Sequence, residues 1–450
     1  MTEPLTTDRL THARVLRIAL PIVLSNATVP LLGAVDTGVI GQLGQAAPLG
    51  AVGMGAVILA SFYWMFGFLR MGTTGLVAQA RGAGDKAEVS AVLIRALLIG
   101  QTAGLVFVAA QALLFWAAFA VAPASPQVEG FARTYLSIRI WGAPATIALY
   151  AITGWLIAVE RTRSVLVVQV LMNGLNVCLD LWFVLGLGWG VEGVAIATLI
   201  AEYSGLALGL WLCRDALGWT ALCDRARIFN AARLARMLSV NGDIMVRSIL
   251  LQVAFTSFVF LGAGLGDATL AANQVLMLFL EVTAYALDGF AFAAEALVGA
   301  AVGAGARDVV RRAGIMTSQW GIGGAFVVTL GFWLAGPAII DLMTTAPEVR
   351  AVARDYLPWL VVAPVIGIAS WMLDGIYIGA TWTGAMRTAM LQAVAVYVVA
   401  VLVLVPALGN HGLWAALMVL NIARAMALGW RYRALEAAVH SQSARPVPTA

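Results

Sequence analysis

Acidic and carboxamide side chains inside long apolar runs are the residues of this sequence best suited to chemistry. Asn173, Asn176 and Asp180 are spaced three and four residues apart, which places them on one face of a helix. Their oxygen atoms can coordinate a hard cation, or Asp180 can instead carry a proton. A second carboxylate, Asp36, follows Pro30 on the first apolar run, and the proline removes a backbone hydrogen bond and permits a bend. We interpret Asp36 and Asp180 as ion- or proton-binding residues, Pro30 as a gating kink, and Asn173 equally as a helix-packing residue.

Further charged residues lie inside apolar runs of the second half. Asp243 and Arg247 are four residues apart, the spacing at which an acid and a base meet along a helix, so we expect a structural ion pair. Glu281, Asp288 and Glu295 recur at every seventh residue and share one face, which either lines a lumen or neutralises nearby arginines. The side chains that this pattern offers to a flat cationic compound, as counter-charges or as aromatic surfaces, are Asp374, Asp288, Glu295, Tyr63 and Trp371.

The elements that must position these residues are membrane helices. Of the 450 residues 62% are hydrophobic and 11% are charged, whereas soluble proteins carry roughly a quarter charged residues. Apolar runs that can supply the ~20 residues of one bilayer crossing occur twelve times between positions 15 and 430. They are too long and too uniformly apolar for barrel strands. The sequence therefore predicts an all-α integral membrane protein with twelve transmembrane helices.

The basic residues predict how the chain is oriented. Most of the 27 Lys and Arg residues, Arg424 among them, fall in even-numbered connections or near the termini, while few, including Arg139, fall on the opposite side. Because basic loops are retained in the cytoplasm, we expect both termini there, in a bacterial inner membrane. This topology accounts for the net charge of +4 without nucleic acid as a partner.

Two similar halves follow one another along the chain. A constant offset pairs Gly82 with Gly303 and Gly154 with Gly375. Each half holds an even number of crossings, so the halves are expected to be parallel repeats about an axis along the membrane normal, an organisation suited to alternating access. The predicted parts are an N-lobe at residues 1–213, a cytoplasmic connection at 214–235 and a C-lobe at 236–450 that ends in a short tail.

Signatures of enzymes and cofactor sites are absent from the sequence. It has no Walker loop, no dinucleotide fingerprint and no His-containing metal motif, and its three cysteines lack metal-ligand spacing. Without a nucleotide site, transport must be driven by an ion gradient. We therefore expect a monomeric secondary transporter that is not an enzyme and needs no cofactor.

Short motifs stand in order along the two halves. They are Val35-Asp36-Thr37, Asn176-x-x-x-Asp180, Thr198, Leu287-Asp288-Gly289-Phe290, Ala294-Glu295-Ala296, Asp374-Gly375-Ile376 and Gly379-Ala380-Thr381. Together they resemble the multidrug and toxic compound extrusion (MATE) family, specifically its DinF-like branch, over essentially the whole chain.

The resemblance implies a V-shaped pair of six-helix lobes that exports amphipathic, often cationic compounds against an inward flow of H⁺ or Na⁺. It assigns the coupling ion to Asp36, Asn176, Asp180 and Thr198, where either a proton or Na⁺ is expected. The other large branch of the family uses acids on the seventh and tenth spans, of which Asp374 alone matches here. This departure favours coupling in the N-lobe, with H⁺ ahead of Na⁺.

Two other functions fit parts of the pattern. A lipid-linked oligosaccharide flippase shares the lobe architecture but needs cavity cations for a pyrophosphate, whereas the candidates here are mostly acidic; a net positive cavity would favour it. An integral-membrane transferase needs paired carboxylates near a membrane surface and a basic phosphate-binding loop. The short loops and the internal repeat argue against the transferase.

Overall fold

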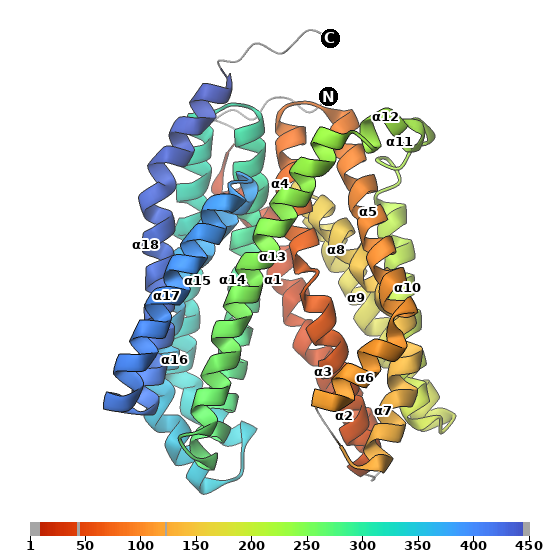
Figure 1. The fold of residues 1–450 in the computed structure, drawn as a ribbon, viewed down its shortest axis with the longest axis vertical. Coiled ribbons are helices and arrows are strands. Elements are labelled where there is room, and N and C mark those ends of the chain that lie inside the picture. The colour runs from red at the N-terminus through yellow and green to blue at the C-terminus, as the bar shows by residue number, and fades with distance from the viewer. Residues whose placement is uncertain (1–9, 43–45, 122–123, 444–450) are drawn as a thin grey trace. The chain divides into compact units, whose positions relative to one another are not determined.

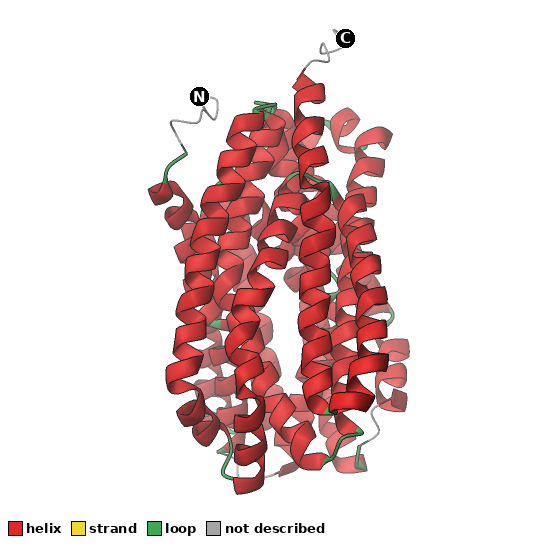
Figure 2. Cartoon of the chain, turned by 90° about the vertical axis from the view of Figure 1, so that its left-hand side faces the viewer, coloured by secondary structure: helices red, strands yellow, loops and turns green. Residues whose placement is uncertain are grey.

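The structure, a computed structural model, describes residues 10–42, 46–121 and 124–443, and within these ranges the chain is helical and contains no β-strand (Figure 1, Figure 2). Eleven helical segments of this part are long and apolar enough to cross a membrane. The predicted all-α membrane fold is therefore confirmed.

The helices of the first half are α1 (His12–Ala27), α2 (Val29–Gly41), α3 (Ala46–Trp64), α4 (Gly67–Gly82), α5 (Lys86–Ala109), α6 (Gln111–Val121), α7 (Pro126–Arg139), η2 (Ile140–Gly142), α8 (Ala143–Ala158), α9 (Thr162–Asp180), η3 (Leu181–Gly186) and α10 (Gly190–Leu212). Two short helices follow, α11 (Trp219–Cys223) and α12 (Arg225–Ile228), and the second half consists of α13 (Ala231–Ala263), α14 (Asp267–Gly303), α15 (Arg307–Met343), α16 (Pro347–Gly379), α17 (Thr383–Leu408) and α18 (Asn410–Ser443).

The first crossing is built from two helices instead of one. α1 ends at Ala27, Thr28 forms a turn, and α2 begins at Val29, so each piece is shorter than a full span. Pro30 lies in the first turn of α2, where its missing N–H costs no helical hydrogen bond. The predicted bend is thus a break before the proline, whose side chain lies outside the described residues. With α1 and α2 taken as one crossing, the count reaches the predicted twelve.

The chain packs as two units whose borders differ from the predicted lobes. One unit contains Met1–Val23, Ala78–Gly84 and Met237–Ala450. The other contains Leu24–Val77 and Asp85–Arg236. The helices of the second half therefore pack with most of α1 and with the end of α4, two segments that the sequence assigned to the N-lobe.

Glycines bring the end of α4 against α14 inside the first of these units. A Cβ atom on Gly82 would meet the carbonyl of Ala300, and one on Gly303 would meet the carbonyl of Gln79. The side-chain amide of Gln79 also donates to the carbonyl of Gly379 at 3.1 Å. Only glycine lets two helix backbones approach this closely. Since Gly82 and Gly303 correspond in the repeat, the contact is made by equivalent residues of the two halves.

The repeat also appears inside each unit. In one, Gly154 of α8 lies against the backbone carbonyl of Arg70 on α4. In the other, Gly375 of α16 lies against the backbone carbonyl of Ala291 on α14. The offset that pairs the two glycines also pairs Arg70 with Ala291. The two halves thus make equivalent helix contacts, as the predicted repeat requires.

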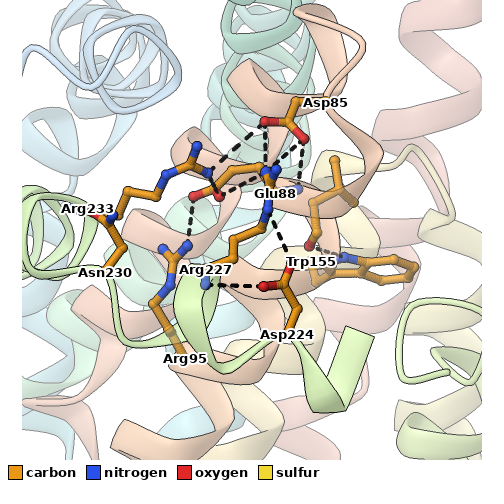
Figure 3. Close-up of polar contacts among 9 residues, drawn as sticks. Asp85, Glu88, Arg95, Trp155, Asp224, Arg227, Asn230 and Arg233 are labelled. Carbon is orange, nitrogen blue, oxygen red and sulfur yellow. Dashed lines mark hydrogen bonds and ion pairs between the residues drawn. The ribbon is translucent and has the colours of Figure 1, made fainter. Parts of the chain in front are cut away.

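The connection between the halves is tied to the start of α5 (Figure 3). Arg227 of α12 lies 2.9 Å from a carboxylate oxygen of Asp85, and Arg233 pairs with Glu88. Glu88 also binds Arg95 at 2.7 Å, while Asp85 caps α5 by accepting from the backbone N–H of Glu88. These ion pairs fix the predicted connection on the second unit.

Candidate functional site

Two carboxyl groups meet inside the unit formed by Leu24–Val77 and Asp85–Arg236. Asp36 on α2 and Asp180 at the end of α9 lie close enough to share a hydrogen bond. Asp180 is 0% exposed, and within the described part of the chain no donor reaches either of its oxygens or Oδ1 of Asp36. Directly after Asp180 the chain forms the π-helix Leu181–Gly186, a distortion that is frequent at functional sites. Two carboxylates this close repel each other unless a proton or a cation neutralises them.

Asn176 and Thr198 add oxygen atoms to this pair. The amide nitrogen of Asn176 donates to the hydroxyl of Thr198 at 3.1 Å, and that hydroxyl donates to the carbonyl of Val194 at 2.9 Å. Among the residues that the structure describes, none donates to the buried Oδ1 of Asn176. Among the described residues no three His, Cys, Asp or Glu side chains gather as a metal site, so a cation here would depend on these amide and hydroxyl oxygens. Of the five residues predicted for ion coupling, Asp36 and Asp180 thus form one pair, and Asn176, one helical turn before Asp180 on α9, binds Thr198.

Asn173, the fifth, has a different partner. Its amide nitrogen donates to the carbonyl of Thr28 at 3.1 Å and to the Thr28 hydroxyl at 2.7 Å. Its oxygen accepts from Gln169 at 2.9 Å. The side chain therefore holds the break between α1 and α2 from the helix that also carries Asp180.

A buried ion pair lies beside the carboxyl pair. Arg139 of α7 and Glu202 of α10 form two hydrogen bonds of 2.7 and 2.9 Å, and their side chains are 9% and 10% exposed. Arg139, which was predicted for the external side, is a buried side chain in the candidate span Pro126–Ala158. Its charge acts on both Asp36 and Asp180. The hydroxyl of Tyr63, which was predicted to face substrate, is buried 3.5 Å from the Arg139 carbonyl.

In the other unit Asp374 of α16 is shared by two arginines. Arg247 of α13 and Arg424 of α18 both donate to its Oδ2 atom. Asp243 instead accepts from Arg387 at 2.6 Å. The predicted Asp243–Arg247 pair is therefore wrong, because each of these side chains reaches across to another helix, where it neutralises a charge that would otherwise lie buried alone.

Arg424 also differs from its predicted place. It is 3% exposed and lies midway along the candidate span Asn410–Val439, so it is a buried side chain and not part of an exposed connection. Both arginines bind Oδ2 of Asp374, and the role of this residue toward a cationic compound stays a prediction. The sequence signal for Arg424 was available, since an acid within an apolar run requires a buried partner.

The remaining predicted substrate residues lie on α14 and α16. Glu295 is buried, whereas Asp288 and Trp371 are half-buried. Both acids interact with other residues, and the ring of Trp371 lies against Gly367 of its own helix. Their role toward substrate stays a prediction.

Comparison with known proteins gives consistent similarities along the whole chain. The MatE family model matches residues 21–182 and again 244–405, once in each half. The DNA damage-inducible protein F of Escherichia coli is 41% identical over 421 residues, which cover 92% of this chain and 91% of that protein. A probable multidrug resistance protein NorM of Bradyrhizobium diazoefficiens is 27% identical over 93% of this chain and 92% of its own length. Among solved structures, a MATE protein in the bent conformation has the same fold, with a TM-score of 0.85 at 19% identity over 96% of this chain and 97% of that one.

Proposed function

The chain belongs to the MatE family of membrane transporters, and from that premise we propose that it is a secondary active efflux antiporter. Its substrates are amphipathic, often cationic compounds, exchanged for H⁺, with Na⁺ as the alternative coupling ion. The similarity to a probable multidrug resistance protein supports this substrate class. We propose that the protein is a monomer in the inner membrane. Both termini lie in the cytoplasm in this proposal, because most basic residues fall in the connections expected on that side.

The observation that carries the proposal is the carboxyl pair of Asp36, which is half-buried, and Asp180, which is fully buried. In the described part of the chain three oxygens of the pair have no donor, so a bound proton or cation would satisfy them. Binding of that ion neutralises the pair, and its release restores two repelling charges. A gradient of the ion therefore drives the change between the two states.

The helix break at Thr28 connects ion binding to movement. α2 carries Asp36 and starts directly after the break, while α9 carries both Asp180 and the Asn173 side chain that holds the break. In the proposed cycle, the unloaded pair keeps α2 and α9 apart and substrate binds from the cytoplasm. Ion entry from outside removes the repulsion, α2 closes on α9, and substrate is released outside.

We favour H⁺ over Na⁺ because of the hydroxyl of Thr198. This hydroxyl already accepts from Asn176 and donates to Val194, which leaves one lone pair for a metal ion. A proton requires only the two carboxylates.

The test is export of a fluorescent cationic dye from proteoliposomes under separately imposed H⁺ and Na⁺ gradients. We expect a pH gradient alone to drive export, and Asp36→Asn or Asp180→Asn to abolish it. Glu192→Gln removes an exposed acid at the start of α10 and is the matched control, which should keep wild-type export. Thr198→Val should keep proton-driven export, whereas under Na⁺ coupling it should lose it. Wild-type export by either aspartate variant, or no export under any gradient, would refute the proposal.

A further inference from the structure

The arginine cluster of the second half carries more positive than negative charge. Arg247 and Arg424 lie on α13 and α18, near the middle of their spans, and are 8% and 3% exposed. Among the described residues, the one carboxylate that they bind is Asp374, and both donate to the same oxygen of it. Asn421, which accepts from Arg424 at 3.1 Å, is neutral. Two guanidinium groups therefore share a single buried anion.

Neighbouring acids do not restore the balance. Asp243 forms an ion pair with Arg387, as described above. Within the described residues, the hydrogen bonds of Arg247 and Arg424 to an acid go to Asp374 alone, and Glu295 and Asp288 of α14 have interactions of their own. In addition, Nε of Arg247 is buried and has no acceptor in the described part of the chain. An unbalanced buried charge and an unpaired charged donor are both costly, so their presence together points to a missing anion.

Guanidinium groups define the chemistry of that anion. Arginine presents planar, parallel N–H groups that match the two oxygens of a carboxylate, and it binds phosphate oxygens in the same way. One added negative charge would balance the cluster. A second carboxylate would also give each arginine its own anion, in place of the shared oxygen of Asp374.

We propose that Arg247 and Arg424 form an anion-binding subsite that takes the carboxylate of a zwitterionic or anionic amphipathic substrate. The inference rests on the proposed export function and narrows its substrate class. Substrates with a carboxylate would bind this cluster, whereas purely cationic substrates would gain nothing from it.

The experiment compares two rhodamines that differ in one group. Rhodamine 19 carries a free carboxylate, and rhodamine 6G is its ethyl ester. Binding of each dye to the purified full-length protein is followed by fluorescence anisotropy at neutral pH without any ion gradient. The variants are Arg247→Gln and Asp374→Asn, and Arg387→Gln is the control because Arg387 is bound to Asp243 outside the cluster.

We expect Arg247→Gln to raise the Kd of the acid dye about ten- to a hundredfold, the range for loss of a charge-assisted hydrogen bond, and to leave the ester unaffected. Asp374→Asn should tighten binding of the acid dye, since it removes a competing carboxylate; a merely structural role of Asp374 predicts no such gain. The control should keep the wild-type ratio of the two Kd values. Equal effects on both dyes, or weaker acid binding in Asp374→Asn, would overturn the proposal.

Competition separates two sources of the anion. Dodecanoate and dodecyl phosphate have the same chain and differ in the head group. Stronger displacement of the acid dye by dodecanoate supports a carboxylate substrate, whereas stronger displacement by dodecyl phosphate overturns it in favour of a lipid phosphate. The export assay tests the antiport function separately. Gradient-driven export of the ester dye without any preference for the acid dye in binding would support antiport and refute the subsite. Selective binding of the acid dye without gradient-driven export would refute antiport and leave the subsite supported.

Discussion

The buried ion pair of Arg139 and Glu202 allows a quantitative prediction. Glu202→Gln keeps the shape of the side chain but removes its charge, so the Arg139 guanidinium loses the carboxylate that it binds at 2.7 and 2.9 Å. Both side chains are about nine-tenths buried, so water can replace little of that interaction. Breaking such a pair by removal of one partner costs about 3–5 kcal/mol. We therefore expect Glu202→Gln to lower the free energy of unfolding by an amount in this range.

The assay is equilibrium unfolding in mixed micelles of dodecylmaltoside and increasing SDS, read by tryptophan fluorescence. The double variant Arg139→Met with Glu202→Leu removes both charges and should recover most of the lost stability, because no charge is then stranded. The exposed pair of Arg133 and Glu129 is the control, and loss of its charge should cost about 1 kcal/mol or less. A cost below about 1 kcal/mol for Glu202→Gln, or no recovery in the double variant, would refute the reasoning.

Three further predictions concern packing, the helix break and pH. Gly375→Ala places a methyl group against a backbone carbonyl and should cost about 1–3 kcal/mol, whereas Gly130→Ala, which has open space, should leave stability unchanged or slightly raised; thermal unfolding in detergent decides between these outcomes. Asn173→Ala removes both hydrogen bonds to the break in the first crossing, so we expect a loss of about 1–2 kcal/mol and slower dye export with unchanged ion dependence; export at the wild-type rate would contradict a role in movement. The Arg161 guanidinium holds the pKa of Asp215 below its usual value, so this exposed pair stabilises the fold at pH values above about 4, and its contribution is lost as the pH falls through the lowered pKa. Asp215→Asn should therefore be less stable than wild type by less than about 1 kcal/mol at pH 7, with the difference shrinking in acid; a difference that grows in acid would show the opposite linkage.

The fold class could be predicted from the sequence because the bilayer imposes strong constraints. Long apolar runs permit helices alone, and the arginine pattern sets how these runs are divided. The carboxyl pair was accessible for the same reason, since Asp36 and Asp180 stand in runs where a charge is expensive. Pro30 indicated a distortion nearby but not its form, because a proline can either bend a helix or begin one.

The partners of the buried charges could not be predicted in the same way. Arg139 and Arg424 stand near other basic residues in the sequence, such as Arg133 and Arg431, so sequence alone does not separate a loop arginine from one that binds a carboxylate on another helix. The spacing of Asp243 and Arg247 indicates only a pairing within one helix, but both side chains bind residues of other helices, Arg387 and Asp374. Such pairing depends on which helix faces touch, and this is decided by long-range packing that periodicity does not encode.

The borders of the two units have a consequence for how the protein is made. The unit that contains the second half also requires Met1–Val23 and Ala78–Gly84, which leave the ribosome long before α14 does. During synthesis these early segments enter the membrane before the helices with which they pack. The unit therefore completes its packing only after the last helices have been inserted. A gene split within the connection would therefore yield two fragments, and the C-terminal one would be missing part of its own core until the other was present. We therefore expect neither half of the sequence to fold on its own, although the two halves are similar to each other.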